Sequence, residues 1–312
     1  CPSGVDMAKL KYEFFNHYYQ SHSRKLRDYL FGYIGEFAKL GAPLGKLVNL
    51  GLGNRVIGDR AKKALGVSEK RNLPKFEKGS HSLLVTSHSS RDTVLYLPDP
   101  FTRYFEPEIE QAAMQVLHTA GLDVIILPVL GAGRTLISKS FLNGAKKHAQ
   151  KVRDEIAKID PEGKYPVVGA EPSEIYTFKD EYLDFFPRDE SMYALAKRCW
   201  MIDEFLLRDD IALRIVTLKC VKNAENWADR NSTFLAEKIS LHGHCYQKAR
   251  PPADDNHPVG QEATAELLRA VGYEVDIIPS GCCGMAGSFG FETEHYELSM
   301  AVGELVLFPE IR

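Results

Sequence analysis

Two stretches of the sequence lie over one another at a constant offset, AGLDVIILPVLGAGR at 120–134 and VGYEVDIIPSGCCGM at 271–285. Each runs from a glycine through aliphatic residues to a proline and a second glycine-rich turn. Further upstream, LPDPF at 97–101 has a counterpart in LHGHC at 241–245. A strand followed by a helix and a second, parallel strand has this pattern. We therefore predict an α/β fold of two similar Rossmann-like βαβ halves.

Around these stretches, short β-rich runs alternate with helical ones, as in a mainly parallel sheet. The expected strands are 93–97, 123–127, 165–170, 212–216, 238–242 and 274–278, and the expected helices are 107–120, 140–158, 191–207 and 260–270. Ahead of them, residues 6–37 have helical spacing and residues 41–74 suggest small helices. We expect three segments: a helical segment at 1–80, a first half at 81–190 and a second half at 191–312.

The composition excludes several classes of protein. With 44% hydrophobic and 26% charged residues, the chain resembles ordinary globular proteins. A net charge of −3 with both signs scattered gives no basic face for a nucleic acid. No apolar stretch approaches the roughly 20 residues of a membrane span. We expect a cytoplasmic protein and leave peripheral attachment to the inner face of the membrane open.

The six cysteines are too few for a disulfide scaffold, and five of them lie in the last third or so of the chain. Cys245 follows one expected strand, and Cys282 and Cys283 follow another. Loops at the carboxyl ends of parallel strands meet in one crevice, so the three thiols should converge. Thiolates are soft ligands that select iron–sulfur clusters or zinc. We predict an iron–sulfur site on these three cysteines.

Other residues contribute to this prediction. Gly281 and Gly284 let the backbone curl closely around a cluster, and His244 is a candidate for orienting the loop or for ligating zinc instead. Cys199 and Cys220 each stand alone, and a lone cysteine beside a strand usually packs in the core. No side chain is assigned a catalytic acid or base role. Thiol or disulfide chemistry at the paired cysteines, with a thiolate of lowered pKa, is a third hypothesis.

Taken together, six segments resemble the cysteine-rich CCG-domain proteins, a group with members in heterodisulfide reductase and in the iron–sulfur part of glycolate oxidase. The resemblance is greater to the C-terminal part of FAD-linked D-2-hydroxyacid dehydrogenases of the D-lactate and D-2-hydroxyglutarate type. It rests on CPSGVDMAKLKYEF at 1–14, DPFTRYFEPE at 99–108, GRTLISKS at 133–140, EPSEIYTFKDEY at 171–182, HGHCYQKA at 242–249 and GCCGMAGSFGFETEHYELSM at 281–300.

This resemblance implies an electron relay. An upstream flavin domain carrying FAD would oxidise the hydroxyacid, a ferredoxin-like module would follow, and this part would pass electrons to a further acceptor through a cluster, expected to be 4Fe–4S. Cys1, which precedes a proline, is placed like the last ligand of that ferredoxin-like module. The alternative is a zinc-binding or metal-free module that docks the flavin domain.

The sequence departs from the pattern of these relatives. Many carry two cysteines where this chain has Gly131 and Ala132, and a cysteine where it has Glu174. Many also continue past the position of Arg312 to a further cysteine. These departures speak against a cluster in the first half and leave the second half one ligand short. At the degenerate site, four polar residues could form a pocket or a solvated ion-pair network: Arg134, Lys139, Glu171 and Glu174.

Overall fold

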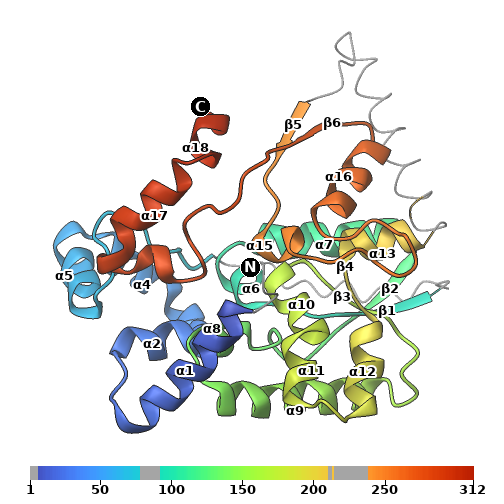
Figure 1. Cartoon of the computed structure of the whole chain (residues 1–312), viewed down its shortest axis with the longest axis horizontal. Coiled ribbons are helices and arrows are strands. Elements are labelled where there is room, and N and C mark those ends of the chain that lie inside the picture. The colour runs from blue at the N-terminus through green and yellow to red at the C-terminus, as the bar shows by residue number, and fades with distance from the viewer. Residues whose placement is uncertain (1–5, 78–91, 210–212, 214–237) are drawn as a thin grey trace.

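The computed structural model describes residues 6–77, 92–209, 213 and 238–312. It is a mixed α/β structure with parallel sheets (Figure 1). The strands are β1 (Asp92–Tyr96), β2 (Leu122–Ile126), β3 (Val167–Gly169), β4 (Cys199–Met201), β5 (Lys238–Leu241) and β6 (Glu274–Ile277). The helices between and after the strands are α6 (Pro100–Tyr104), α7 (Pro107–Thr119), α8 (Arg134–Ser138), α9 (Leu142–Ile159), α10 (Pro172–Lys179), α11 (Glu181–Phe185), α12 (Glu190–Lys197), α13 (Ile202–Arg208), α15 (Cys245–Lys248), α16 (Gln261–Ala270), α17 (Tyr296–Gly303) and α18 (Leu307–Ile311).

The larger sheet has four parallel strands in the order β2-β1-β3-β4. Alternate residues of β1 point to opposite faces, as the pleat of a strand requires. Leu95 packs in a core with helices α9 to α12. Val94 and Tyr96 pack in a second core with α7 and α13. Both faces of the sheet are therefore covered, which explains the nearly continuous apolar strands.

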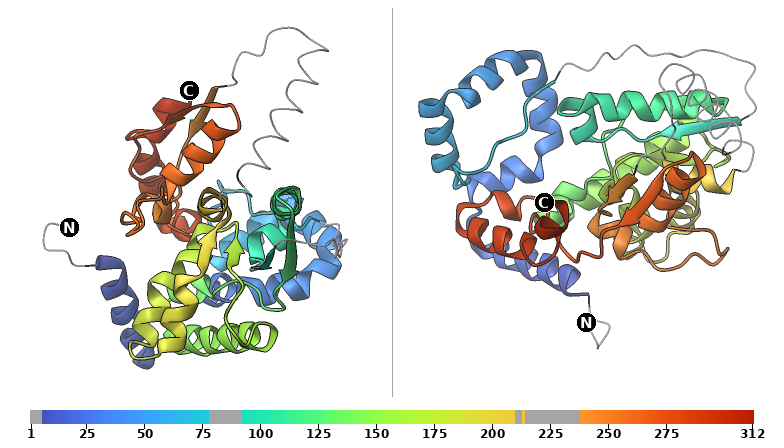
Figure 2. Two further views of the ribbon diagram at one scale, coloured as in Figure 1. Left: turned by 90° about the vertical axis from the view of Figure 1, so that its right-hand side faces the viewer. Right: turned by 90° about the horizontal axis from the view of Figure 1, so that it is seen from above.

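The smaller sheet pairs β5 with β6, again in parallel, and α16 joins them. It stands beside the four-stranded unit (Figure 2). Helix α16 contacts α13, and the backbone N–H of Gly260 donates to the buried Glu204 Oε1 at 3.0 Å. Polar contacts as well as apolar ones therefore join the two sheets.

Within residues 6–77 the structure has five helices, α1 (Met7–Ser21), α2 (Leu26–Gly32), α3 (Ile34–Gly41), α4 (Gly45–Gly53) and α5 (Arg55–Leu65), with a 3₁₀ turn at Ala42–Leu44. Helix α1 contacts α9, α2 contacts α8, and α3 contacts α6. Two further 3₁₀ turns, Phe289–Phe291 and Thr293–His295, precede α17. None of the described helices is long and apolar enough to cross a membrane.

Most expected elements are confirmed, and one is wrong. The helix predicted over 191–207 is two helices, α12 and α13, separated by strand β4. The strand expected at 212–216 lies outside the described residues, apart from Leu213, which is helical. The division into segments 1–80, 81–190 and 191–312 stays a prediction.

Candidate metal centre

The three predicted thiols lie at the same edge of the smaller sheet. Strands β5 and β6 run in parallel, so their carboxyl ends meet there. Cys245 is the first residue of α15, just beyond β5, and Cys282 and Cys283 follow β6. The Cys245 side chain is exposed and the other two are half-buried. Burial, followed by the charges of Cys282 and Cys283, raises the pKa of the Cys245 thiol.

His244 positions Cys245 by capping its helix. The His244 Nδ1 accepts a hydrogen bond from the Tyr246 N–H at 3.2 Å, and the His244 N–H donates to Gln247 Oε1 at 3.0 Å. This reciprocal pair is a capping box, which fixes the first turn of a helix. One ring nitrogen of His244 is thus engaged by the backbone. The predicted orienting role of His244 therefore has a physical basis in the cap.

Lys248, one turn after Cys245, ties the two cysteine-bearing loops together. Its Nζ donates to the Ser280 carbonyl at 2.7 Å and to Ser280 Oγ at 3.1 Å. The Lys248 Nζ also lies 3.2 Å from His242 Nδ1. The same His242 nitrogen is 2.7 Å from Ser280 Oγ. Sequence reasoning missed Lys248. Its position one helical turn beyond a candidate ligand was the available signal, because residues i and i+3 share a helix face.

Gly284 shapes the loop that carries the paired cysteines. Its φ of 82° lies in the left-handed region, and a Cβ there would meet the Ser299 carbonyl oxygen at 2.0 Å. In this conformation the Gly284 N–H donates to Cys282 Sγ at 3.3 Å. At Gly281, by contrast, an added Cβ would meet no heavy atom within 4 Å. The loop is therefore closely packed on one side of the cysteines and open on the other.

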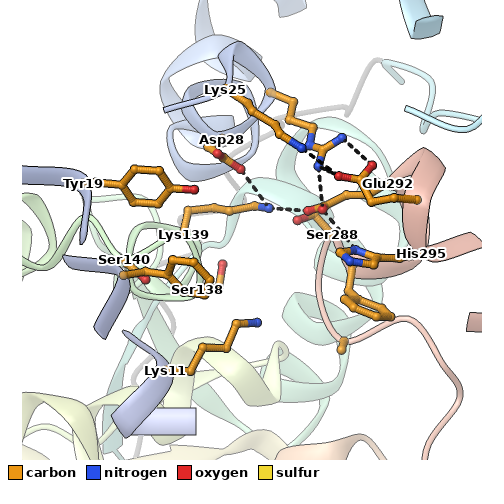
Figure 3. A pocket seen from close by; sticks show the side chains of 15 residues that line it. Lys11, Tyr19, Lys25, Asp28, Ser138, Lys139, Ser140, Ser288, Glu292 and His295 are labelled. Carbon is orange, nitrogen blue, oxygen red and sulfur yellow. Dashed lines mark hydrogen bonds and ion pairs between the residues drawn. The ribbon is translucent and has the colours of Figure 1, made fainter. Parts of the chain in front are cut away.

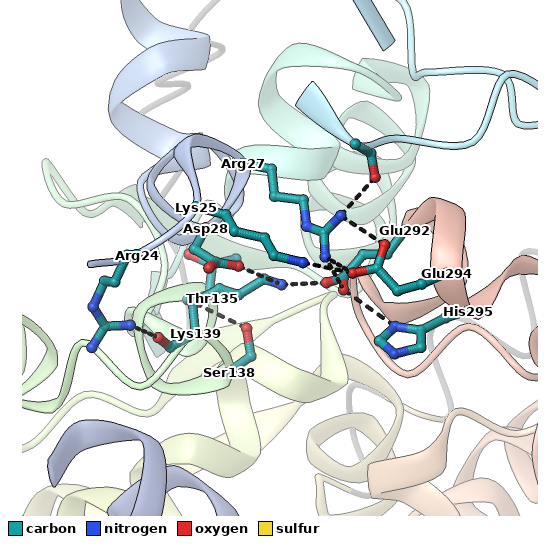
Figure 4. A network of polar contacts seen from close by, with 11 residues as sticks. Arg24, Lys25, Arg27, Asp28, Thr135, Ser138, Lys139, Glu292, Glu294 and His295 are labelled. Carbon is teal, nitrogen blue, oxygen red and sulfur yellow. Dashed lines mark hydrogen bonds and ion pairs between the residues drawn. The ribbon is translucent and has the colours of Figure 1, made fainter. Parts of the chain in front are cut away.

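A buried ion network holds the segment that follows this loop (Figure 4). Arg27 of α2 pairs with Glu292 at 3.0 Å and with Glu294, and its Nη1 donates to the Gly66 carbonyl at 2.7 Å. Lys139 pairs with Glu292 at 2.6 Å from the other side. Three regions far apart in sequence therefore fix the chain after the paired cysteines.

The same network borders a cavity of about 290 Å³. It lies between α1, α2, residues 138–140 and residues 286–295 (Figure 3). Lys11 projects into it from α1, opposite the ion pairs of Lys139 and Glu292. The cavity is thus polar, and its wall begins three residues beyond Cys283.

The loop that follows β2 in the larger sheet, Gly131–Arg134, is filled by a carboxylate. Glu174 Oε2 accepts hydrogen bonds from the N–H groups of Ala132 at 2.5 Å and Arg134 at 3.3 Å. Burial, followed by the nearby carboxylate of Asp99, raises the pKa of Glu174 to about 8. In sheets of this strand order, ligands enter at the switch point between β1 and β3. Here the buried side chain of Glu174 occupies that place.

The four polar residues that the sequence suggested for a pocket around this loop do not form one pocket. Arg134 forms a buried ion pair with Glu181, and its guanidinium lies 4.7 Å from the ring centroid of Tyr246. Glu171 caps α10 by accepting from the Ser173 N–H at 3.1 Å. Lys139 belongs to the ion network already described. Arg134 therefore connects the first loop to the residue next to Cys245.

Of the three remaining cysteines, the structure describes Cys199 alone. Cys199 is fully buried in the core of the larger sheet, as predicted, and its Sγ contacts the Leu195 carbonyl at 3.2 Å. Cys1 and Cys220 lie outside the described residues. The assignment of Cys1 to an upstream cluster stays a prediction.

The chemistry of the site fits a thiolate-ligated group. Within residues 6–77, 92–209 and 238–312, no three His, Cys, Asp or Glu side chains form a group that could hold one metal ion. Lys248 joins the loop of Cys245 to the loop of Cys282 and Cys283, which has an N–H donor at one sulfur and open space beside Gly281. Thiolates of this kind, with hydrogen bonds to sulfur, are the donors that iron–sulfur clusters use.

Sequence comparisons identify dehydrogenase relatives. D-2-hydroxyglutarate dehydrogenase of Escherichia coli is 23% identical over 98% of this chain, and that of Haemophilus influenzae is 21% identical over 97%. One component of the anaerobic glycerol-3-phosphate dehydrogenase of Escherichia coli is 24% identical over 91%. The chain is homologous to these dehydrogenases. It spans 29% of the length of the two hydroxyglutarate enzymes and 68% of the glycerol-3-phosphate dehydrogenase component.

Two other comparisons give no match. Neither a protein-family profile nor a solved structure matches the chain.

Proposed function

We propose that this chain is the electron-transfer, iron–sulfur portion of a flavin-dependent D-2-hydroxyacid dehydrogenase. In this role it takes electrons from FAD on an upstream domain, through a ferredoxin-like module, and passes them to a downstream acceptor. One observation carries the proposal: Cys245, Cys282 and Cys283 lie in the two loops that follow the parallel strands β5 and β6. The homology to D-2-hydroxyglutarate dehydrogenases supports it.

The chain's own residues would hold and tune the cluster. The three cysteines would supply thiolates, and the Gly284 N–H would donate to the Cys282 sulfur, a type of contact that adjusts the reduction potential. Lys248 would fix the distance between the two loops through Ser280. The cluster itself would supply one-electron transfer. No described side chain needs to act as an acid or base.

Thiolates bind both zinc and iron–sulfur clusters. We favour a cluster because the relatives are dehydrogenases and zinc has no redox chemistry with which to pass electrons on. A 4Fe–4S cluster takes four cysteines, so a fourth ligand would complete the set.

The proposal includes the internal repeat and the place of the protein in the cell. Both sheets contain a parallel strand pair joined through a short helix and a longer one, α6 with α7 and α15 with α16. Gly133 and Gly284 share a φ of 82°. These features support two halves of common origin, of which the first has lost its cysteines. We place the protein in the cytoplasm, where thiols stay reduced.

The test is anaerobic purification of the chain, followed by iron and sulfide analysis and a visible spectrum. A double variant, Cys282→Ser with Cys283→Ser, should lose the iron and the brown colour. Cys199→Ser is the matched control, because burial raises the pKa of that thiol to about 12 and it lies in the core. Stoichiometric zinc, or iron retained in the double variant, would refute the proposal and favour a docking module.

A further inference from the structure

Helices α3 and α4 expose their largest apolar side chains. Phe37, Leu40, Leu44 and Leu47 recur at intervals of three and four residues, which places them on one face of a nearly continuous helical run. They are 46%, 74%, 60% and 66% exposed, respectively. Farther along, Leu50 is 73% exposed, and Val56 and Ile57 at the start of α5 are each 58% exposed. We call these seven residues the apolar stripe.

The face of this run that packs on the protein is made of small residues. Ala38 and Gly45 are buried, and an added Cβ at Gly41 or Gly45 would meet the Phe76 side chain at 3.0 or 2.7 Å. Asn49 exchanges two hydrogen bonds with the Phe76 backbone, at 2.8 and 2.9 Å. The usual amphipathic arrangement is therefore inverted, since the bulky apolar side chains face away from the body.

The apolar stripe lies in the most cationic part of the N-terminal segment. Residues 34–65 contain six Lys or Arg and two Asp or Glu, although the whole chain carries a net charge of −3. Lys39 and Lys46 flank the stripe on its own helices, and both are exposed. Helices α4 and α5 lie at the edge of the molecule, away from the large sheet (Figure 1).

The composition of the stripe indicates its occupant. Residues 34–65 contain no Trp or Tyr, which are enriched together with Arg at the centres of protein interfaces. Leucines flanked by lysines are typical of helices that lie in the plane of a lipid interface. An anionic bilayer satisfies both the apolar and the cationic part. Binding to a bilayer does not require a protein surface of complementary shape.

We infer that the apolar stripe docks the protein on an anionic lipid bilayer, with Leu40, Leu44, Leu47 and Leu50 entering the acyl boundary and Lys39 and Lys46 contacting head groups. This attachment is peripheral. It goes beyond the electron-transfer role and does not depend on it, because none of the stripe residues belongs to the cysteine-bearing loops.

The experiment is cosedimentation of the 312-residue chain with vesicles of phosphatidylglycerol and phosphatidylcholine in equal parts, and with vesicles of phosphatidylcholine alone. We expect the chain to sediment with the anionic vesicles. A triple variant, Leu40→Ser, Leu44→Ser and Leu47→Ser, should lower the bound fraction at least about tenfold. Lys39→Glu with Lys46→Glu should weaken binding to the anionic vesicles about fivefold per lysine.

The matched control replaces two leucines elsewhere. Leu298 and Leu305 are 56% and 77% exposed but lie outside the stripe, so Leu298→Ser with Leu305→Ser should bind like the unchanged chain. Equal urea midpoints for all variants would show that each is folded. A chain that stays in the supernatant, or a triple variant that still binds, overturns the inference. So does a concentration-dependent dimer that only the triple variant loses, since the occupant is then a second copy.

Discussion

Replacing Arg27 with alanine should weaken the fold more than any other single change in the ion network. The Arg27 side chain is 5% exposed and makes contacts with Glu292, Glu294 and the Gly66 carbonyl. Breaking a buried pair by removing one partner typically costs about 3–5 kcal/mol, because a charge is left without compensation.

The environment of each partner narrows this range. Glu292 keeps Lys139 at 2.6 Å after the change, and the Glu294 side chain is 41% exposed and can be rehydrated. The Gly66 carbonyl loses a charge-assisted donor, which costs about 1–3 kcal/mol if no water replaces it. We therefore expect a loss near the lower limit, about 3 kcal/mol of unfolding free energy.

Urea unfolding, followed by far-ultraviolet circular dichroism, measures this loss as a shift of the midpoint at constant slope. Lys25→Ala is the matched control, because Lys25 pairs with the same Glu294 but its side chain is 64% exposed. Its effect should stay below about 1 kcal/mol. If the two variants shift the midpoint equally, the network is a surface feature and our reasoning about burial is wrong.

Two further changes test the loops at the two sheets. The folded pKa of Glu174, about 8, lies above its ordinary value of 4.5, so its contribution to stability is complete below pH 4.5 and is lost as the pH rises through 8. Glu174→Gln should remove this slope, on the order of 1.4 kcal/mol per pH unit, in urea unfolding at several pH values, and equal slopes in both proteins would contradict it. Gly284→Ala should abolish iron loading on reconstitution because of the clash at 2.0 Å, whereas Gly51→Ala in α4, where an added Cβ meets no heavy atom within 4 Å, should load normally. Similar iron contents in the two glycine variants would show that the loop does not need its left-handed turn.

Local patterns predicted the parallel strands well, because apolar runs bounded by turns leave few alternatives. The error was β4, where Cys199–Met201 is only three residues long and lies between two helical segments. Its pairing with β3 is a tertiary contact, which the periodicity of its own sequence does not encode.

The sequence also placed the three cysteines in loops after two parallel strands, and the structure has them there. Their role as ligands stays a prediction. The sequence did not reveal Lys248 bound to Ser280, or Glu174 inside the first loop. Each of these two contacts is made by a side chain that extends from a helix to a loop elsewhere in the fold. The local sequence pattern does not encode such a contact. The Arg27 network was missed for the same reason, since its members come from three distant regions of the chain.

The pairing of Arg27 with Glu292 joins positions 265 residues apart. Contacts of such separation form late in folding, because a long loop must close before they are gained. The segment after Cys283 therefore reaches its final shape only when the N-terminal helices and the C-terminal turns have both been synthesised and have met. Under the proposed function, a cluster in the neighbouring loop would be loaded after this closure, on a chain whose termini have already met.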